Sequence, residues 1–357
     1  MQPRPRRHLR VVGALLHRVL AGDGAARRPV RLRTRHGRGG SDVGQRRWGD
    51  AVAAASGRAL RRTVSEARVR PWTRRFWWTV EGVAFAIVIA PFFVIPADAA
   101  VRAFAAVGRW GLPLAPAARR IRENLAMVRP SLQPRRITRE VGDNFGRVLA
   151  EYIRMPDFAA RSERRHARGV EHLRQAAAAG RGVVVVSAHF GNWEAVRLAA
   201  RDAGVDVGIL YRAFNNPLFD AMSIWRIRAA GEPVLHKGRQ GGRGLLGALK
   251  RGGVVMVLLD QRSGGDPLIA FLGREAETAT AVAALAQRTG AALIPAFAQR
   301  RADGLSFDVT FEPPLPPGDP ISVTGAINDR FSAWVDAAPG QWFWLHHRWK
   351  RRKVRAR

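Results

Sequence analysis

From residue 169 onward, short β-branched runs alternate with stretches of helical periodicity, and this alternation restricts the fold more than any other feature. The runs at 183–186 and 254–259 are continuously apolar, which is typical of strands buried on both faces. Strands that alternate with helices pair in parallel, because each helix carries the chain back across the sheet. We therefore predict an α/β fold, a mainly parallel sheet flanked by helices, with ligands at the carboxyl ends of its strands.

The expected elements follow from where these periodicities begin and end. Upstream of the sheet, helical spacing at 119–128 and 137–152 predicts a helical N-terminal region. Within the α/β part we predict strands at 183–187, 207–211, 233–236, 254–260, 293–298 and 307–311, and helices at 193–203, 217–230, 242–251 and 279–289.

Residues 1–70 differ in composition from the rest of the chain. They contain 18 Arg and 4 acidic residues, in a chain whose formal net charge is +32. One interpretation is a basic, disordered arm that contacts membrane or nucleic acid. The interpretation that we adopt is a tail without function, such as a wrongly chosen translation start would add. Residues 351–357 form a second basic tail.

The basic composition favours polyanionic partners: nucleic acid, anionic lipid head groups or an acidic carrier protein. The chain has no Cys, which excludes disulfides, thiolate metal sites and a cysteine nucleophile.

An apolar segment at 76–96 predicts an element that meets a membrane. Glu81 is its one charged residue, and the uncharged stretch at 82–97 is shorter than the roughly 20 residues that span a bilayer. Arg74, Arg75 and the aromatic residues after them suit an interface between membrane and cytoplasm. We assign 71–98 to a membrane-anchor or interfacial helix, with a buried core helix as the alternative.

The segment from Ser187 to Glu194 carries the clearest chemical pattern. The strand at 183–187 leads directly into it, and a Gly-Asn turn separates His189 from the next helix, where Glu194 lies in the first turn. Across that turn the carboxylate of Glu194 can reach one imidazole nitrogen and leave the other to accept a proton from an alcohol. The alternative is a structural pair, with His189 bound to a backbone carbonyl and Glu194 capping the helix.

The same segment resembles the His-x4-Asp/Glu motif of the lysophospholipid acyltransferase superfamily. Its form His-Phe-Gly-Asn-Trp-Glu is similar to the bacterial lipid A biosynthesis (lauroyl/myristoyl) acyltransferases. Further segments match that branch in the same order: Tyr211-Arg212, Asn215-Asn-Pro217, Asp260-Gln261, Phe271-Leu-Gly273 and residues 342–350. The likeness covers about 72–350, which makes 99–350 the expected acyltransferase domain.

The resemblance implies transfer of an acyl chain from an acyl-thioester, usually on acyl carrier protein, to a hydroxyl of a lipid A precursor. His189 is then the general base and Glu194 its orienting partner. Backbone N–H groups near Gly191 and Asn192, or a nearby Arg, are the expected donors to the oxyanion. The expected location is the cytoplasmic face of the inner membrane, and no cofactor, metal or nucleic acid is expected.

Two strand ends supply further substrate-binding candidates. Arg212, with Tyr211, follows a strand, and its guanidinium suits a phosphate, with a salt bridge as the alternative. Asn215 and Asn216 are weaker candidates, because an Asn before Pro217 also caps a helix.

The second group of candidates begins at the end of the strand at 254–260. Asp260 is able to orient Arg212 or another basic group in the cleft, and Gln261 is assigned to the substrate with it. Phe271 and Gly273 are expected to shape an acyl channel, with core packing as the alternative.

Several other patterns carry less weight. The Gly-rich run at 237–244 lacks the ending of a P-loop, and His346-His347 lie apart from other ligand types, so we predict neither a phosphate loop nor a metal site there. Trp342, Trp344 and Trp349 fit either a lipid interface or core packing. The rival functions are acylation of another lipid and, from a different class, nucleic-acid binding, which the apolar segment at 76–96 disfavours.

Overall fold

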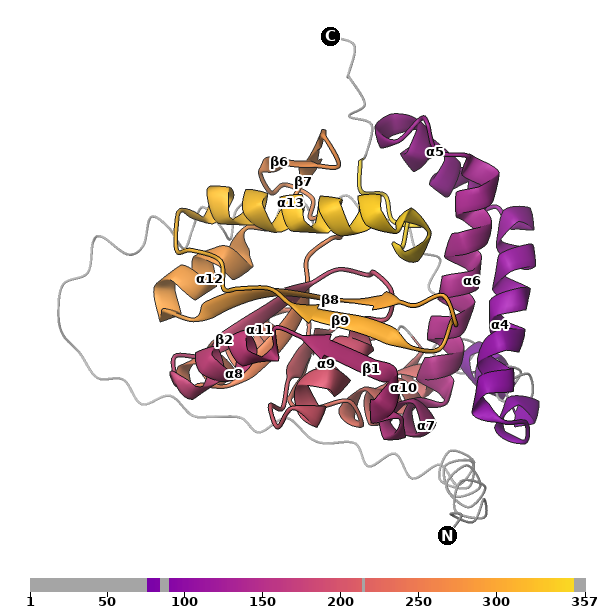
Figure 1. The fold of residues 1–357 in the computed structure, drawn as a ribbon, viewed down its shortest axis with the longest axis horizontal. Coiled ribbons are helices and arrows are strands. Elements are labelled where there is room, and N and C mark those ends of the chain that lie inside the picture. The colour runs from indigo at the N-terminus through magenta and orange to yellow at the C-terminus, as the bar shows by residue number, and fades with distance from the viewer. Residues whose placement is uncertain (1–75, 84–89, 214–215, 350–357) are drawn as a thin grey trace, which may run out of the picture. The chain divides into compact units, whose positions relative to one another are not determined.

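A seven-stranded sheet forms the centre of the computed structural model, which describes residues 76–83, 90–213 and 216–349 (Figure 1). The strand order is β1-β9-β8-β2-β5-β3-β4, and every neighbouring pair is parallel except β8 with β9. The predicted mainly parallel α/β sheet is thus confirmed. The strands are β1 Arg165–Arg168, β2 Val183–Ser187, β3 Gly208–Tyr211, β4 Val234–His236, β5 Val254–Leu258, β8 Ala292–Arg300 and β9 Phe307–Phe311.

The two central strands β2 and β5 explain why their sequences are apolar throughout. Val184 and Val186 belong to the core on one face of the sheet, whereas Val183 and Val185 belong to the core on the other. Successive side chains of a strand point to opposite faces, so a strand covered on both sides needs apolar residues at every position.

Helices cover both faces of this sheet (Figure 1). The core of one face includes residues of α8 Val170–Ala178, α9 Trp193–Asp202 and α10 Pro217–Arg228. The opposite core includes residues of α11 Arg239–Lys250, α12 Ala281–Thr289 and α13 Pro320–Ala337. A short hairpin, β6 Leu268–Phe271 and β7 Arg274–Glu277, packs on α13.

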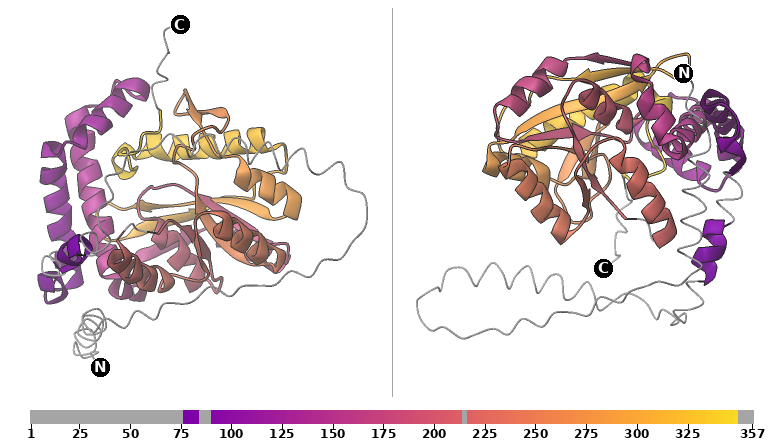
Figure 2. Two further views of the ribbon diagram at one scale, coloured as in Figure 1. Left: turned by 180° about the vertical axis from the view of Figure 1, so that it is seen from behind. Right: turned by 90° about the horizontal axis from the view of Figure 1, so that it is seen from below.

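A helical region precedes the sheet, as predicted. Its long members α4 and α6 lie side by side in both views (Figures 1 and 2). A Cβ on Gly108 or Gly142 would come within 2.1 Å of the other helix's backbone, so this close approach requires glycine. The elements are α4 Ala97–Gly111, η2 Leu112–Leu114, α5 Ala118–Val128, α6 Pro134–Ile153, α7 Met155–Ala160 and η3 Ser162–Arg164, and η4 Pro339–Gln341 follows α13.

The segment expected to meet a membrane is only partly described. Residues 76–83 are helical, residues 84–89 lie outside the described residues, and the short helix η1 Ala90–Phe93 precedes a turn. Within the described residues, no helix has both the length and the apolar character needed to cross a bilayer. The expected extension at 1–70 and the tail at 351–357 lie outside the described residues.

Several elements were not among those predicted. The strand β1, the helices α8 and α13 and the hairpin β6–β7 are additions, and α11 begins at Arg239 inside the Gly-rich run. The elements that were predicted have observed bounds within a few residues of the predicted ones, and those of β2 and β9 agree with them.

Candidate active site

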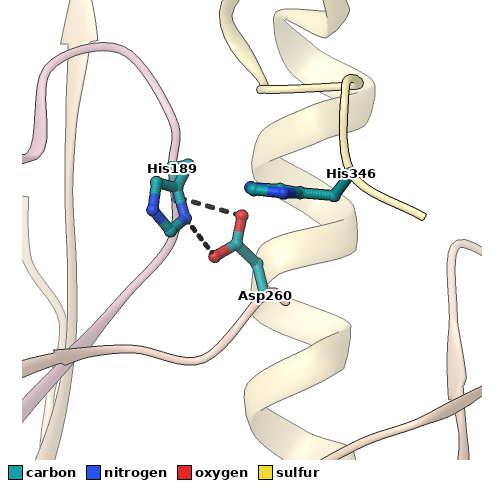
Figure 3. Close-up of side chains that lie close together, drawn as sticks. All are labelled: His189, Asp260 and His346. Atoms are coloured by element: carbon teal, nitrogen blue, oxygen red, sulfur yellow. Dashed lines mark hydrogen bonds and ion pairs between the residues drawn. The ribbon is translucent and has the colours of Figure 1, made fainter. Parts of the chain in front are cut away.

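His189 and Asp260 meet because they follow two neighbouring parallel strands at the same level. The strands β2 and β5 pair with Ser187 opposite Leu258, so the residues two positions further along lie side by side. The Nδ1 atom of His189 is 2.8 Å from Oδ1 of Asp260, and the backbone N–H of His189 donates to Oδ2 at 3.0 Å (Figure 3). A strand-end carboxylate therefore holds both the ring and the backbone of the histidine.

Charge and hydrogen bonds keep the Asp260 carboxyl ionised although it is fully buried. Burial by itself raises the pKa of a carboxyl group. Here the positive charge and hydrogen bond of His189, together with His346 and the indole N–H of Trp342, hold the pKa of Asp260 well below its usual range. Trp342 donates to Oδ2 at 2.8 Å. An ionised Asp260 can only accept, so the proton of a neutral His189 resides on Nδ1 and Nε2 is free to take another.

A second histidine, His346, faces His189 from the closing segment of the chain (Figure 3). Their ring centroids are 5.1 Å apart. Burial, together with the positive charges of His189, Arg348 and Arg120, lowers the pKa of His346 to about 4, despite the opposing effect of Asp260. His346 is therefore neutral at pH 7. The predicted separation of His346 from other ligand types is wrong, because the fold brings Gln261, 85 positions away along the chain, into contact with its ring.

His189, Asp260 and His346 also offer a set of ligand atoms that could hold a metal ion. One ligand atom from each lies within 4.8 Å of the others. Two imidazoles and a carboxylate suit a transition metal. However, Nδ1 of His189 already donates to Asp260, and the amide nitrogen of Gln261 lies between the two rings, so a cation would have to displace both interactions.

Glu194 does not make the contact that the sequence predicts. It is fully buried in α9, where its Oε1 accepts from the hydroxyl of Tyr152 at 2.6 Å and its Oε2 from Arg197 at 2.6 Å. Asp260, not Glu194, lies against the imidazole. The predicted contact between His189 and Glu194 is therefore replaced by one between His189 and Asp260. The reason is the sheet topology, because β5, the neighbour of β2, brings its carboxylate closer to the ring than the turn brings Glu194. Whether catalysis requires Glu194 stays a prediction.

Glu194 nevertheless lies behind His189 in a buried network. Burial, followed by the charge and hydrogen bond of Glu194, raises the pKa of Tyr152 well above its usual value, so the phenol remains a donor. The indole N–H of Trp193 donates to the Tyr152 oxygen at 2.8 Å, and the Trp193 ring lies edge-on to His189 with 5.0 Å between centroids. Arg197 also donates to backbone carbonyls of Val207, Ile227 and Gly231.

The turn between His189 and α9 is fixed by its backbone. Gly191 has φ +54°, and a Cβ there would lie 1.7 Å from the carbonyl oxygen of Ala298, so only glycine fits. The Asn192 side chain caps α9 by accepting from the N–H of Glu194 at 3.0 Å. Its amide donates to Glu151, which forms a buried ion pair with Arg300.

The residues after β3 have varied surroundings. Arg212 is exposed at the same edge of the sheet as His189, and the hydroxyl of Tyr211 donates to Asp220 at 2.9 Å. Asn216 is buried, and its amide donates to the Trp78 carbonyl and to Glu81 in the helical segment 76–83. Asn215 lies outside the described residues. Their substrate roles stay predictions.

Phe271 and Gly273 belong to the β6–β7 hairpin. Phe271 is fully buried, with ring centroids 5.4 Å from Trp342 and 5.7 Å from Trp349. Gly273 has φ +78° in the tight turn of the hairpin. These positions suit core packing and a turn, and the expected acyl channel stays a prediction.

Trp342, Trp344 and Trp349 are all buried. Their burial favours core packing over the alternative of a lipid interface.

A cavity of about 710 Å³ lies between α6, the β8–β9 turn and η4. Its lining includes Arg136, Arg147 and Arg300, which pair with Glu140, Asp143 and Glu151 respectively. None of the residues around the His189 imidazole lines it, so we do not assign the reacting groups to this cavity.

Comparison with known proteins adds a family to this geometry. Residues 70–351 match the model of the bacterial lipid A biosynthesis acyltransferases. The chain is 30% identical over 294 residues to a lipid A biosynthesis lauroyltransferase of Escherichia coli (strain K12), covering 78% of this chain and 93% of the relative. It is 28% identical over 193 residues to a lipid A biosynthesis palmitoleoyltransferase of the same organism, covering 52% and 61%. It is also 28% identical over 242 residues to a phosphatidylinositol mannoside acyltransferase of Mycobacterium tuberculosis (strain CDC 1551 / Oshkosh), covering 64% and 76%.

Proposed function

Since the chain belongs to the bacterial lipid A biosynthesis acyltransferase family and is an acyltransferase, we propose that it moves a fatty acyl chain from an acyl-thioester to a hydroxyl of a lipid A precursor, with His189 as the general base. The observation that carries this proposal is the His189–Asp260 pair, which leaves Nε2 of His189 as a proton acceptor at the carboxyl edge of the sheet.

The reaction follows from the protonation states of this pair. Nε2 of His189 removes the proton of the acceptor hydroxyl as its oxygen attacks the thioester carbonyl. The tetrahedral intermediate then collapses, the carbon–sulfur bond breaks, and the imidazolium returns its proton to the leaving thiolate. Asp260 fixes the ring and stabilises the imidazolium, and it remains ionised throughout.

Glu194 has a different role in this scheme. It holds Tyr152 and Arg197, and through Tyr152 it fixes the Trp193 ring that lies against His189. We propose that it is a positioning residue for the His189 turn, so that its loss lowers activity together with stability.

We propose acyl carrier protein as the donor. The net charge of +32 favours association with an acidic carrier and with anionic phosphates of the acceptor lipid. Arg212, exposed at the same edge as His189, suits a phosphate of either partner.

The acceptor has one specific alternative. The mannoside acyltransferase that resembles this chain is matched over 76% of its length, more than the palmitoleoyltransferase at 61%. A glycosylated phosphoinositide is therefore the second candidate acceptor, because it offers the same chemistry: a sugar hydroxyl on a phosphate-bearing lipid.

We further propose that the enzyme works at the cytoplasmic face of the inner membrane. Trp77, Val94, Trp110 and Leu114, in or near the helical N-terminal region, are more than half exposed. Apolar side chains beside basic ones suit a lipid headgroup layer. Flotation with vesicles of anionic lipid tests this: we expect the wild-type chain to float and the Trp110→Ser/Leu114→Ser variant to float less, and equal flotation would contradict the assignment.

Mass spectrometry of cellular lipids tests the reaction. Deletion of the gene should remove one acyl chain from lipid A, and wild type, but not His189→Ala, should restore it. A change confined to glycosylated phosphoinositides would select the alternative acceptor. Unchanged lipids after deletion, or full restoration by His189→Ala, would refute the proposal.

A further inference from the structure

The side-chain amide of Gln261 lies between the two histidines of the site. Its nitrogen is 3.4 Å from Nε2 of His189 and 3.2 Å from Nε2 of His346. Gln261 directly follows Asp260, so the strand end that orients the base also fixes the position of this amide. The nitrogen atom that is expected to take the proton therefore has an amide group beside it.

The protonation states make this amide a donor to both rings. Asp260 holds the proton of neutral His189 on Nδ1, so Nε2 is an acceptor. His346 is neutral at pH 7, and its Nε2 is an acceptor when the ring proton is on Nδ1. The two N–H bonds of the Gln261 amide thus match two acceptors, and the His346 contact is the shorter one.

Two backbone N–H groups at the His189 turn, where donors to the oxyanion were expected, are already engaged. The N–H of Gly191 donates to the carbonyl of Gln341 at 2.9 Å, and the N–H of Phe190 donates to the carbonyl of Ala188 at 2.7 Å. A donor to the oxyanion is most effective when it is already positioned where the negative charge develops.

We propose that the Gln261 amide donates a hydrogen bond to the oxygen that becomes negative in the tetrahedral intermediate, and that His346 is the positioning residue that holds this amide in place. The inference rests on the proposed function. When the acceptor hydroxyl binds Nε2 of His189, it displaces one N–H of Gln261. That N–H is then beside the reacting carbonyl, while the other remains on His346 and fixes the amide plane.

The role predicts a specific pattern of kinetic losses. Gln261→Ala should lower kcat about 10²–10³-fold, the cost of removing one oxyanion donor, with the KM of both substrates nearly unchanged. Gln261→Glu keeps the shape but presents an ionised acceptor to the oxyanion, so it should lose at least as much. The Gln261→Glu variant also tests the proposed role if the Gln261→Ala protein fails to fold.

His346 is tested by a double-mutant cycle. His346→Ala should lower kcat about 10-fold by releasing the amide, and it should have almost no further effect in a Gln261→Ala background, because the group that it positions is gone. The neighbouring exposed residue provides the matched control: His347→Ala should leave kcat unchanged. Additive losses, or an effect confined to KM, would overturn the proposal.

The assay uses the full chain with lauroyl acyl carrier protein, once with a lipid A precursor and once with water alone, since thioester hydrolysis passes through the same oxyanion. If His189→Ala equals wild type in both reactions, the proposed function fails. If His189→Ala is inactive while Gln261→Ala keeps kcat within about threefold, the proposed function stands and this inference fails.

Discussion

Two buried carboxylates flank the His189 turn, and they differ in the kind of partner that each one holds. Asp260 binds an imidazole that can gain and lose a proton, and the indole of Trp342. Glu194 binds the phenol of Tyr152 and the guanidinium of Arg197, both of which keep their protons at neutral pH. One carboxylate is thus suited to a change in charge during a reaction, whereas the other is suited to holding structure.

The difference teaches that distance along the chain is a poor guide to chemical role. Glu194 is five residues from His189 and Asp260 is 71 residues away, yet the distant carboxylate lies against the ring. If this distinction holds, substitutions at the two positions should separate activity from stability.

Asp260→Asn should have the largest effect. An amide at this position cannot hold the His189 proton on Nδ1, so kcat should fall about 10³–10⁴-fold, as expected when a base is left in the wrong tautomer. The check is kcat in detergent micelles, with circular dichroism to show that the fold is retained. The exposed residue Asp329 on α13 gives the control, since Asp329→Asn should be neutral. A loss below tenfold would remove Asp260 from the mechanism.

Glu194→Ala should act mainly on the free energy of unfolding. It leaves the fully buried Arg197 without its carboxylate, and breaking a buried pair in this way costs about 3–5 kcal/mol. Urea unfolding measures this cost, and Glu171→Ala, at an exposed position of α8, should change it by less than about 0.5 kcal/mol. If Glu194→Ala abolishes activity while the unfolding free energy is unchanged, the two carboxylates do not divide the roles as described.

His346→Gln should give the smallest effect, on the pH dependence of stability. The folded pKa of His346, about 4, is below its ordinary value of 6.5, so the unfolded chain takes up this proton first as pH falls. Wild type should therefore lose stability between pH 6.5 and 4, and the variant should lose about 1–2 kcal/mol less by pH 5. Urea unfolding at pH 7 and pH 5 tests this against His347→Gln. Equal pH dependence in all three proteins would show that His346 is not held neutral.

The sheet was predictable where burial alone dictates sequence. The continuous valines of β2 and the alternating apolar residues of β9 identify these strands directly. The strands β1 and β7 escaped prediction because their sequences, Arg-His-Ala-Arg and Arg-Glu-Ala-Glu, are almost entirely polar. The helix α13 had a usable signal, since Asp319 caps it and Pro320 opens it.

The site was predictable only in part for a topological reason. Sequence patterns indicate that His189 and Asp260 each follow a strand, but they do not indicate which strands are neighbours. The adjacency of β2 and β5 and the register of Ser187 with Leu258 bring the two residues together. His346 belongs to the segment 342–350, which the family resemblance singled out, but no sequence pattern indicates that this segment folds back onto His189.

The closing segment of the chain has a consequence for synthesis. The indole N–H of Trp342 donates to Asp260, and the backbone N–H of Phe343 donates to the His189 carbonyl. The ring of His346 faces the ring of His189. These residues follow every strand and every long helix of the described part of the chain. A nascent polypeptide that already contains every strand of the sheet therefore still lacks the groups that complete the candidate active site. We expect acyltransferase activity only once translation has passed these positions.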